Sequence, residues 1–237
     1  ITQFSRLRLR SSLKTSFSAM KPQIYAAALD KGYTPATVIL DTPLIYKEQL
    51  ESGDIKEWKP KNYSKRFYGP VPLRTALAKS FNVITVKILE DIGVRYAANY
   101  ARKLGIESRL DEDLTLGLGS SALTPMELAR SYAVLANGGV RVLPTYINKI
   151  YDRDGKVVES NDPADFPGGP QKGQKLIGQS RNRVISPETA YLVTNLLESV
   201  VQHGTGWRAK ALQRPVAGKT GTAEKLPAKV EVTSSSI

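Results

Sequence analysis

Apolar residues recur at helical spacing in several separate stretches of the chain. In the first stretch, Ile24, Tyr25, Ala28 and Leu29 follow a proline, and Gly32 then provides a natural stop, which predicts a helix from residue 22 onwards. Prolines or glycines bound the later helical stretches in the same way. Further helices are predicted over 73–79, 83–89, 94–104, 124–137 and 186–204, the fourth of them opened by the capping box Thr124-Pro125-Met126-Glu127.

The pattern changes to alternation or disappears in the remaining stretches. Residues 140–151 alternate like a strand, and 152–155 supply a turn into 156–158, so a hairpin is predicted. A short strand is expected over 216–222. The span 33–72 is rich in turn formers and aromatic residues and is interpreted as a long ordered connection, a kind of segment that is usually functional. Residues 1–17 show no clear periodicity, and the polar residues 159–183, with their proline and glycine clusters, are interpreted as a mobile loop.

Composition indicates a folded protein with one substantial core. The chain has 237 residues, of which 41% are hydrophobic, and it carries a formal net charge of +12. That charge favours approach to polyanions, but no zinc-ligand spacing or helix-turn-helix signature is present, so nucleic acid is not the expected partner and a solvated basic face is the favoured interpretation. The absence of cysteine excludes disulfides. No stretch reaches the ~18 apolar residues that cross a bilayer, so we expect any membrane anchor to lie outside this chain.

Two Ser-x-x-Lys patterns are candidates for a nucleophile and its base. Ser18 to Lys21 stands directly before Pro22, and proline is tolerated in a helix only in the first turn, so Ser18 is placed at or next to a helix N-terminus. The helix dipole there favours a developing alkoxide, and a lysine kept neutral by desolvation and nearby cations could take the serine proton. Ser11 to Lys14 has no such helix and is disfavoured; for either pair the alternative is a surface serine beside a surface lysine.

A Ser-x-Asn pattern lies between two of the predicted helices, 73–79 and 83–89. Ser80 and Asn82 are expected to project to one side while Phe81 packs inward, so that a hydroxyl and an amide are available together. Taken alone, these two residues are better explained as a helix cap. A second match, residues 180–182, falls in the polar stretch and is interpreted as a chance occurrence.

A Lys-Thr-Gly-Thr sequence occurs once, at Lys219, Thr220, Gly221 and Thr222. The glycine would let a substrate lie along the strand edge, while the lysine and the two hydroxyls suit a carboxylate. The alternative is a plain junction between a strand and a turn. The single histidine, His203, lies near a helix end without an evident acidic partner and is assigned a capping or surface role.

The three motifs occur in the order found in serine β-lactamases and penicillin-binding proteins, and the sequence between them resembles class A penicillin-binding proteins closely. The resemblance divides the chain into an atypical basic segment (1–17), a partial penicillin-binding transpeptidase domain (18–224) and an atypical tail (225–237). The stretches that carry it are 25–39, 62–80, 118–121, 124–139, 183–206 and 217–222.

By this resemblance the fold is α+β, of the serine β-lactamase/transpeptidase type, with a helical lobe against an antiparallel sheet. The implied activity is that of a peptidoglycan D,D-transpeptidase on the periplasmic or extracellular face of the bacterial cytoplasmic membrane. Its partners would be stem peptides ending in D-Ala-D-Ala, the amine of a neighbouring stem, and β-lactams that mimic the donor. No metal or cofactor is implied.

The resemblance also implies a role for each motif residue. Ser18 would be the nucleophile, Lys21 its activating base and Ser80 the relay to the leaving group. Asn82 would hold the peptide amide. The terminal carboxylate would bind to Lys219, Thr220 and Thr222 beside Gly221, and the backbone N–H groups of Ser18 and Thr222 would form the oxyanion hole.

The chain departs from the family pattern at both ends. Phe17 stands where the family has glycine before the nucleophile, and the strands expected before residue 18 and after Thr222 are not recognisable, so the sheet is expected to be incomplete. A non-catalytic fragment that binds peptidoglycan or a partner without turnover is therefore the alternative function. A stand-alone carboxypeptidase or β-lactamase is disfavoured, because residues 33–72 match the class A pattern.

Overall fold

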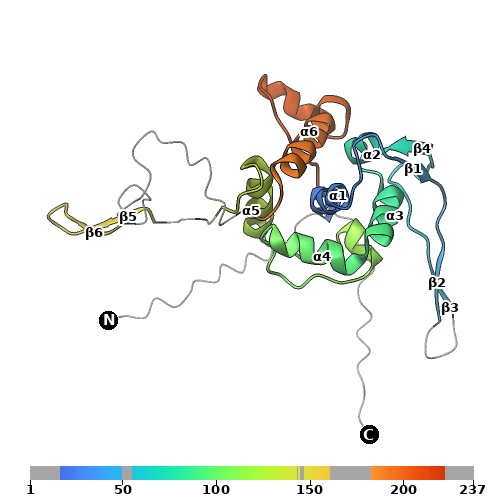
Figure 1. Ribbon diagram of the computed structural model, residues 1–237, viewed down its shortest axis with the longest axis horizontal. Helices are drawn as coiled ribbons and strands as arrows, with labels where there is room; N and C mark the ends of the chain where they lie inside the picture. The colour runs from blue at the N-terminus through green and yellow to red at the C-terminus, as the bar shows by residue number, and fades with distance from the viewer. Residues whose placement is uncertain (1–16, 50–54, 143, 145–146, 161–182, 222–237) are drawn as a thin grey trace, which may run out of the picture.

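A buried helix forms the centre of the computed structural model, which describes residues 17–49, 55–142, 144, 147–160 and 183–221. This helix, α1 (Lys21–Asp30), is seen end-on in Figure 1 with α2 to α6 arranged around it. All its residues from Lys21 to Leu29 are buried. A helix that is apolar on every side is expected in such a position, because it can bury its whole circumference.

The two ends of α1 follow from the residues predicted to set them. A 3-10 turn, η1 (Phe17–Met20), leads into the helix, and Pro22 lies in the first helical turn. At the other end Gly32 adopts φ 96°, and the amide of Tyr33 bonds back to the carbonyl of Ala28 at 3.1 Å, which closes the helix in a Schellman arrangement. The predicted helix and its stop are confirmed.

The surrounding helices also confirm the predicted elements. They are α2 (Leu73–Ala78), α3 (Asn82–Ile92), α4 (Val94–Lys103), α5 (Pro125–Ala136) and α6 (Pro187–His203), with 3-10 turns η2 (Leu114–Leu118) and η5 (Trp207–Leu212). Helix α5 carries the predicted capping box between Thr124 and Glu127. The break between α2 and α3 falls at Ser80, as the sequence indicates.

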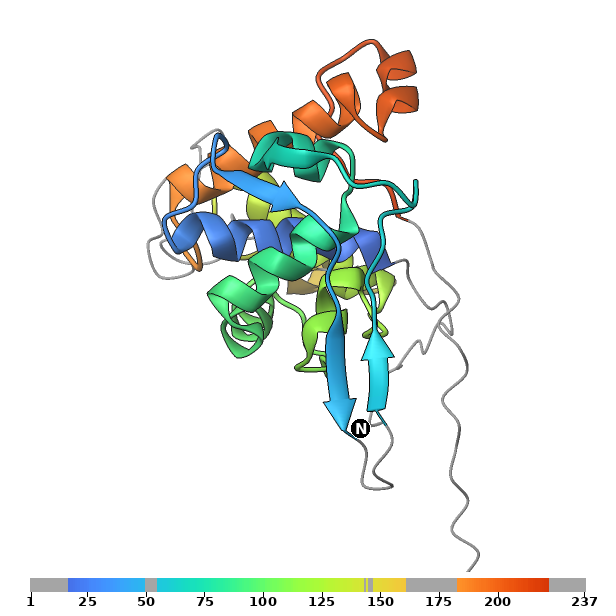
Figure 2. The ribbon, with the colours of Figure 1, turned by 90° about the vertical axis from the view of Figure 1, so that its right-hand side faces the viewer.

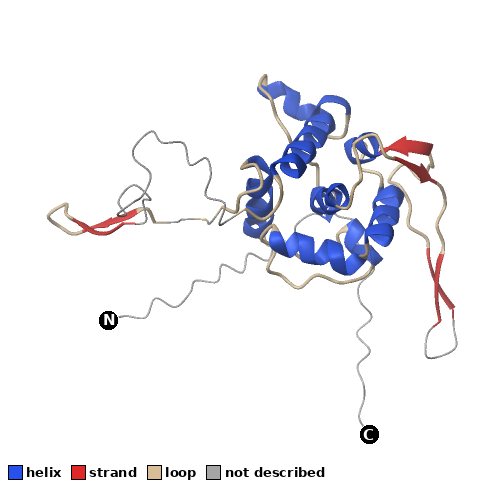
Figure 3. Ribbon diagram, viewed as in Figure 1, coloured by secondary structure: helices blue, strands red, loops and turns tan. Residues whose placement is uncertain are grey.

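Three small antiparallel ladders lie outside this helical body, as Figure 3 shows. Strand β1 (Val38–Asp41) pairs with β4 (Gly69–Pro72), and β2 (Tyr46–Gln49) pairs with β3 (Ile55–Trp58). Figure 2 shows β2 and β3 extending away from the helices as a ribbon. The span 33–72, interpreted as a long ordered connection, thus contains four short strands that its sequence pattern did not indicate. The two prolines of β4 interrupt the alternation by which this strand could have been recognised, and strands that contain proline belong at sheet edges.

Two predicted strands need correction. Among the described residues of the stretch 140–151, only β5 (Lys149–Tyr151) is a strand. It pairs with β6 (Val157–Ser160), which confirms the predicted hairpin. Val140 makes an isolated bridge with Arg183. Residues 216–221 form no strand either, and the amide of Gly218 reaches the carbonyl of Leu197 on α6 at 3.4 Å instead. A strand exists only where a second backbone pairs with it.

Several predicted features lie outside the described residues. These are the Ser11–Lys14 pair, most of the predicted loop 159–183 with its 180–182 match, Thr222 and the tail beyond it. Within the described part of the chain, no helix combines the length and the hydropathy needed to traverse a lipid bilayer.

Close contact between α2 and the end of α6 brings the later motifs together. The Arg74 guanidinium donates to Ser199 Oγ at 2.8 Å, and the Thr205 amide donates to the Ala78 carbonyl at 3.0 Å. The second bond joins the turn after α6 to Ala78, the last residue of α2, two positions before Ser80. The C-terminal motif is thereby held beside the helix break.

Candidate active site

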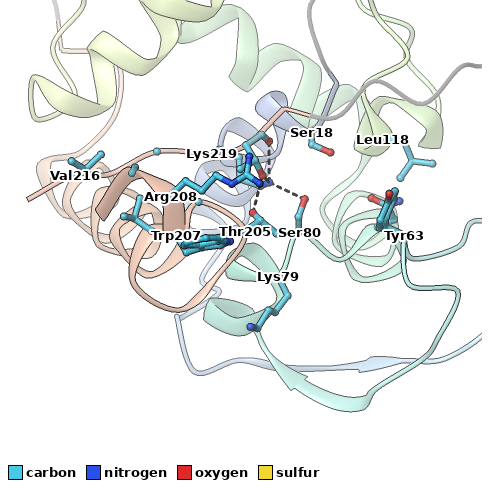
Figure 4. A pocket seen from close by; sticks show the side chains of 16 residues that line it. Ser18, Tyr63, Lys79, Ser80, Leu118, Thr205, Trp207, Arg208, Val216 and Lys219 are labelled. Atoms are coloured by element: carbon cyan, nitrogen blue, oxygen red, sulfur yellow. Dashed lines mark hydrogen bonds between the residues drawn. The ribbon is translucent and has the colours of Figure 1, made fainter. Parts of the chain in front are cut away.

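A cavity of about 960 Å³ lies where η1, the α2–α3 break and the segment after α6 meet. Figure 4 shows the side chains of Lys219 and Ser80 meeting in it, with Ser18 nearby and with Trp207 and Tyr63 on opposite sides. The lining residues come from all three motifs: Ser18, Ser80, Asn82, Lys219 and Thr220, with Tyr63, Lys79, Leu118, Thr205 and 206–209 around them.

Ser18 occupies the second position of η1, one turn before the first residues of α1. The carbonyl of its neighbour Ala19 accepts a hydrogen bond from the Tyr132 hydroxyl of α5 at 2.9 Å. This bond fixes the turn against the helical body. Its donor could not be recognised from the sequence, because Tyr132 lies 113 residues away.

Lys21 is the most deeply buried charged side chain of the site, with 1% of its surface exposed. Its Nζ lies 2.8 Å from the Ser80 carbonyl oxygen, 3.3 Å from Ser80 Oγ and 3.3 Å from the Phe81 carbonyl oxygen. The shortest of its contacts, 2.7 Å, is to Asn82 Oδ1. These four acceptors are neutral and belong to the Ser80–Asn82 turn, so this turn holds the lysine amine next to Ser80 and Asn82, which line the cavity.

The Ser80 hydroxyl joins the two lysines of the site. Its Oγ accepts from Lys21 Nζ at 3.3 Å and from Lys219 Nζ at 2.8 Å. A hydroxyl oxygen has two acceptor positions and one donor, so both acceptor positions are taken and the O–H remains to donate to a third group. Ser80 also adopts φ 60°, a left-handed conformation that is uncommon for a residue with a side chain.

Asn82 is the first residue of α3, and both polar atoms of its side-chain amide form hydrogen bonds. Its Oδ1 accepts from Lys21, while its Nδ2 donates to the Lys61 carbonyl at 2.9 Å. Phe81 is buried between the two motif residues and stacks on Tyr68 with ring centroids 4.6 Å apart. The predicted arrangement, with polar groups to one side and Phe81 inward, is confirmed.

Lys219 and Thr220 complete the polar cluster. Besides Ser80, Lys219 Nζ contacts the Thr220 carbonyl at 3.2 Å, and Thr220 Oγ1 lies 2.7 Å from Thr205 Oγ1. Burial lowers the pKa of Lys219 to about 8, because desolvation disfavours the ammonium form. Gly221 is exposed, and Thr222 lies beyond the described residues.

Comparisons with known proteins agree on one family. A family model for the penicillin binding protein transpeptidase domain matches residues 9–236. Penicillin-binding protein 1A of Pseudomonas aeruginosa is 36% identical over 241 residues, covering 86% of this chain and 29% of that protein. Penicillin-binding protein 1A of Neisseria gonorrhoeae is 38% identical over 217 residues, covering 91% and 26%. The chain belongs to the penicillin-binding protein transpeptidase family.

Comparison with solved structures agrees with this family assignment. Penicillin-binding protein 1A of Haemophilus influenzae gives a TM-score of 0.76 at 33% identity, covering 90% of this chain and 35% of that one. Penicillin-binding protein A of M. tuberculosis, solved as an imipenem acyl-enzyme complex, gives 0.66 at 22% identity, which concerns the fold alone. The predicted serine β-lactamase/transpeptidase-like fold and the resemblance to class A penicillin-binding proteins are confirmed.

This transpeptidase-family chain spans 26–29% of the length of the curated relatives described above. The family model extends on both sides of the 18–224 interval that the motifs delimit, and that interval stays a prediction. His203 is exposed at the end of α6, and no cluster of metal-binding side chains occurs in the described part of the chain.

Three contributors to the transpeptidase-family site were not singled out from the sequence. Thr205, Tyr132 and Asn62 each contact a motif residue or its neighbour from a distant part of the chain. Asn62 belongs to a stretch that carries the family resemblance, which was the one available signal for it. Tyr132 and Thr205 also lie in stretches that carry the resemblance, 124–139 and 183–206, but the local pattern around them indicates no contact with the site.

Proposed function

We propose that this chain is a serine D,D-transpeptidase domain that cross-links peptidoglycan stem peptides through an acyl-serine and is acylated by β-lactams. The observation that carries the proposal is the Ser80 hydroxyl held by both Lys21 and Lys219 in the cavity that Ser18 lines. A hydroxyl nucleophile, a buried amine and a proton-donating hydroxyl are the groups that acyl transfer requires.

Acylation would begin with Ser18. Its Oγ attacks the carbonyl carbon of the penultimate D-alanine, and its proton passes to the neutral form of Lys21. Two ammonium groups sharing one hydroxyl repel each other, so one lysine of the pair gives up its proton more readily than an isolated one. A helix N-terminus at the nucleophile also favours the developing negative charge.

The same network supports departure of the terminal D-alanine. As the peptide C–N bond breaks, the leaving nitrogen takes the proton of the Ser80 hydroxyl, and Lys21 returns the proton it received to Ser80. The acceptor amine of a neighbouring stem then attacks the ester carbon and loses a proton, while Ser18 Oγ leaves and regains one. One peptide bond is exchanged for another, and one D-alanine is released.

Substrate binding would use the remaining motif residues. The ammonium of Lys219 and the hydroxyls of Thr220 and Thr222 suit the terminal carboxylate of the stem or of a β-lactam. Asn82 would hold the peptide amide, and the amides of Ser18 and Thr222 would form the oxyanion hole. These reactions belong on the periplasmic or extracellular face of the cytoplasmic membrane.

Covalent labelling with a fluorescent penicillin tests the proposal. We expect one label per chain, located on Ser18 by tandem mass spectrometry, complete loss in Ser18→Ala, and full labelling in the matched variant Ser11→Ala. Lys21→Ala is expected to slow labelling by about 10²–10⁴-fold, the range of general-base catalysis. Absence of label on protein that melts cooperatively would refute the proposal and favour a non-catalytic fragment that binds without turnover.

A further inference from the structure

A buried amide outside the three motifs contacts the backbone of the Ser80–Asn82 turn. Asn62 is 3% exposed, and its Oδ1 accepts from the amides of Asn82 and Val83 at 2.9 and 3.3 Å. Its Nδ2 donates to Asp41 Oδ2 at 2.8 Å and to the Arg66 carbonyl at 3.0 Å. Every donor and acceptor direction of this amide is therefore assigned.

These bonds give α3 a cap that its own sequence does not supply. Phe81 precedes the helix and provides no side-chain cap, whereas Asn62 satisfies the first two amides from 20 residues upstream. The first of these amides belongs to Asn82, whose side chain holds Lys21 Nζ at 2.7 Å. Asn62 therefore both caps α3 and fixes the backbone that carries the Asn82 side chain.

Asp41 sets the orientation of the Asn62 amide. Its carboxylate is fully buried on β1, and Oδ2 also accepts from the Tyr68 amide at 3.0 Å. A carboxylate accepts but does not donate, so it selects the NH₂ side of Asn62 and leaves the carbonyl side for α3. Asp41 Oδ1 has no hydrogen-bond partner among the described residues, and burial raises the pKa of this carboxyl.

We infer that Asn62, oriented by Asp41, is a positioning residue for the acylation reaction: it holds the Ser80–Asn82 turn in the conformation in which Ser80 and Asn82 line the cavity and bind the amine of Lys21. The inference rests on the proposed function for its effect on the rate. A plain structural cap would lower stability without a selective effect on acylation, and this difference decides the test.

The experiment compares the rate constant for labelling by fluorescent penicillin with amide hydrogen exchange in the full chain. Asn62→Ala is expected to accelerate exchange at the amides of Asn82 and Val83 and to slow the acylation step by about tenfold or more, since small misplacements of reacting groups have effects of this size. Apparent affinity before acylation should change much less. Ser186→Ala, which removes the side-chain cap of α6, serves as the matched control and should label at the parental rate.

Two variants of Asp41 distinguish the effect of its hydrogen-bonding oxygen from the effect of its negative charge. Asp41→Asn keeps a carbonyl oxygen for Asn62 and Tyr68, so labelling should stay within about threefold of the parent, whereas Asp41→Ala should slow it by about tenfold. Parental labelling and exchange in Asn62→Ala would overturn the inference. So would equal slowing in Ser186→Ala, or equal losses in the two Asp41 variants. If the parent itself takes no label, the proposed function fails, while the exchange rates still decide whether Asn62 holds the turn.

Discussion

Adding one methyl group at Gly204 is predicted to separate the end of α6 from the Ser80 turn. A Cβ at this position would overlap the carbonyl oxygen of Ala78 and lie 2.8 Å from that of Val200. The backbone of Gly204 has φ −123° and ψ −154°, which any residue can adopt, so the effect is steric and not conformational. Both neighbours are backbone atoms, and neither can rotate away as a side chain would.

The size of the effect follows from what has to move. Inserting a methyl group into a packed position costs about 1–3 kcal/mol. Displacing the turn also breaks the bond from the Thr205 amide to the Ala78 carbonyl, worth about 0.5–1.5 kcal/mol. We therefore expect Gly204→Ala to lower the free energy of unfolding by about 2–4 kcal/mol, or the melting temperature by about 5–15 °C in a chain of this length.

Thermal melting of Gly204→Ala and of the control Gly218→Ala measures this directly. A Cβ at Gly218 meets no atom within 4 Å, so the stability of the control should stay within about 0.5 kcal/mol of the parent. Labelling by penicillin should also slow in Gly204→Ala, because Thr205 contacts Thr220 at 2.7 Å and moves with the turn. Equal melting temperatures for parent and Gly204→Ala would show that α6 does not pack against α2 in this way.

Two other predictions concern groups beside the nucleophile and the carboxylate site. With a pKa of about 8, Lys219 is an ammonium below that pH and neutral above it, so the second-order labelling rate should fall as the pH rises through about 8. Lys219→Arg should remove this fall, because arginine stays charged. An identical pH profile in both proteins would contradict the prediction. Tyr132→Phe removes the donor to the Ala19 carbonyl, and we expect a loss of about 0.5–1.5 kcal/mol in melting experiments and about tenfold slower labelling; unchanged labelling would show that this bond does not position Ser18.

Local sequence signals were sufficient for the helices. The capping box at Thr124 and the glycine stop at Gly32 depend on residues within one or two turns, so they can be read without knowledge of the fold. The helix break at Ser80 was visible for the same reason. These signals place Ser18, Lys21, Ser80 and Asn82 on their elements.

Strand pairing and distant contacts could not be predicted in this way. Strand β4 is recognised only by its partner β1, and residues 216–221, predicted to be a strand, instead contact α6 through the Gly218 amide. The contact of Lys219 with Ser80 spans 139 positions, and that of Asn62 with Asn82 spans 20 positions that include β4 and α2. Such contacts depend on how the helices pack, which no local pattern records.

The left-handed conformation of Ser80 shows why the site depends on these distant contacts. A residue with a side chain at φ 60° costs of order 1–3 kcal/mol, and glycine would avoid this cost. Glycine would also remove the hydroxyl that Lys21 and Lys219 share. The hydrogen bonds from these two lysines, and the Asn62 cap on the adjoining helix, offset the strain and hold the hydroxyl in place. A turn that would relax on its own is thus kept in a reactive arrangement by three separate segments of the chain.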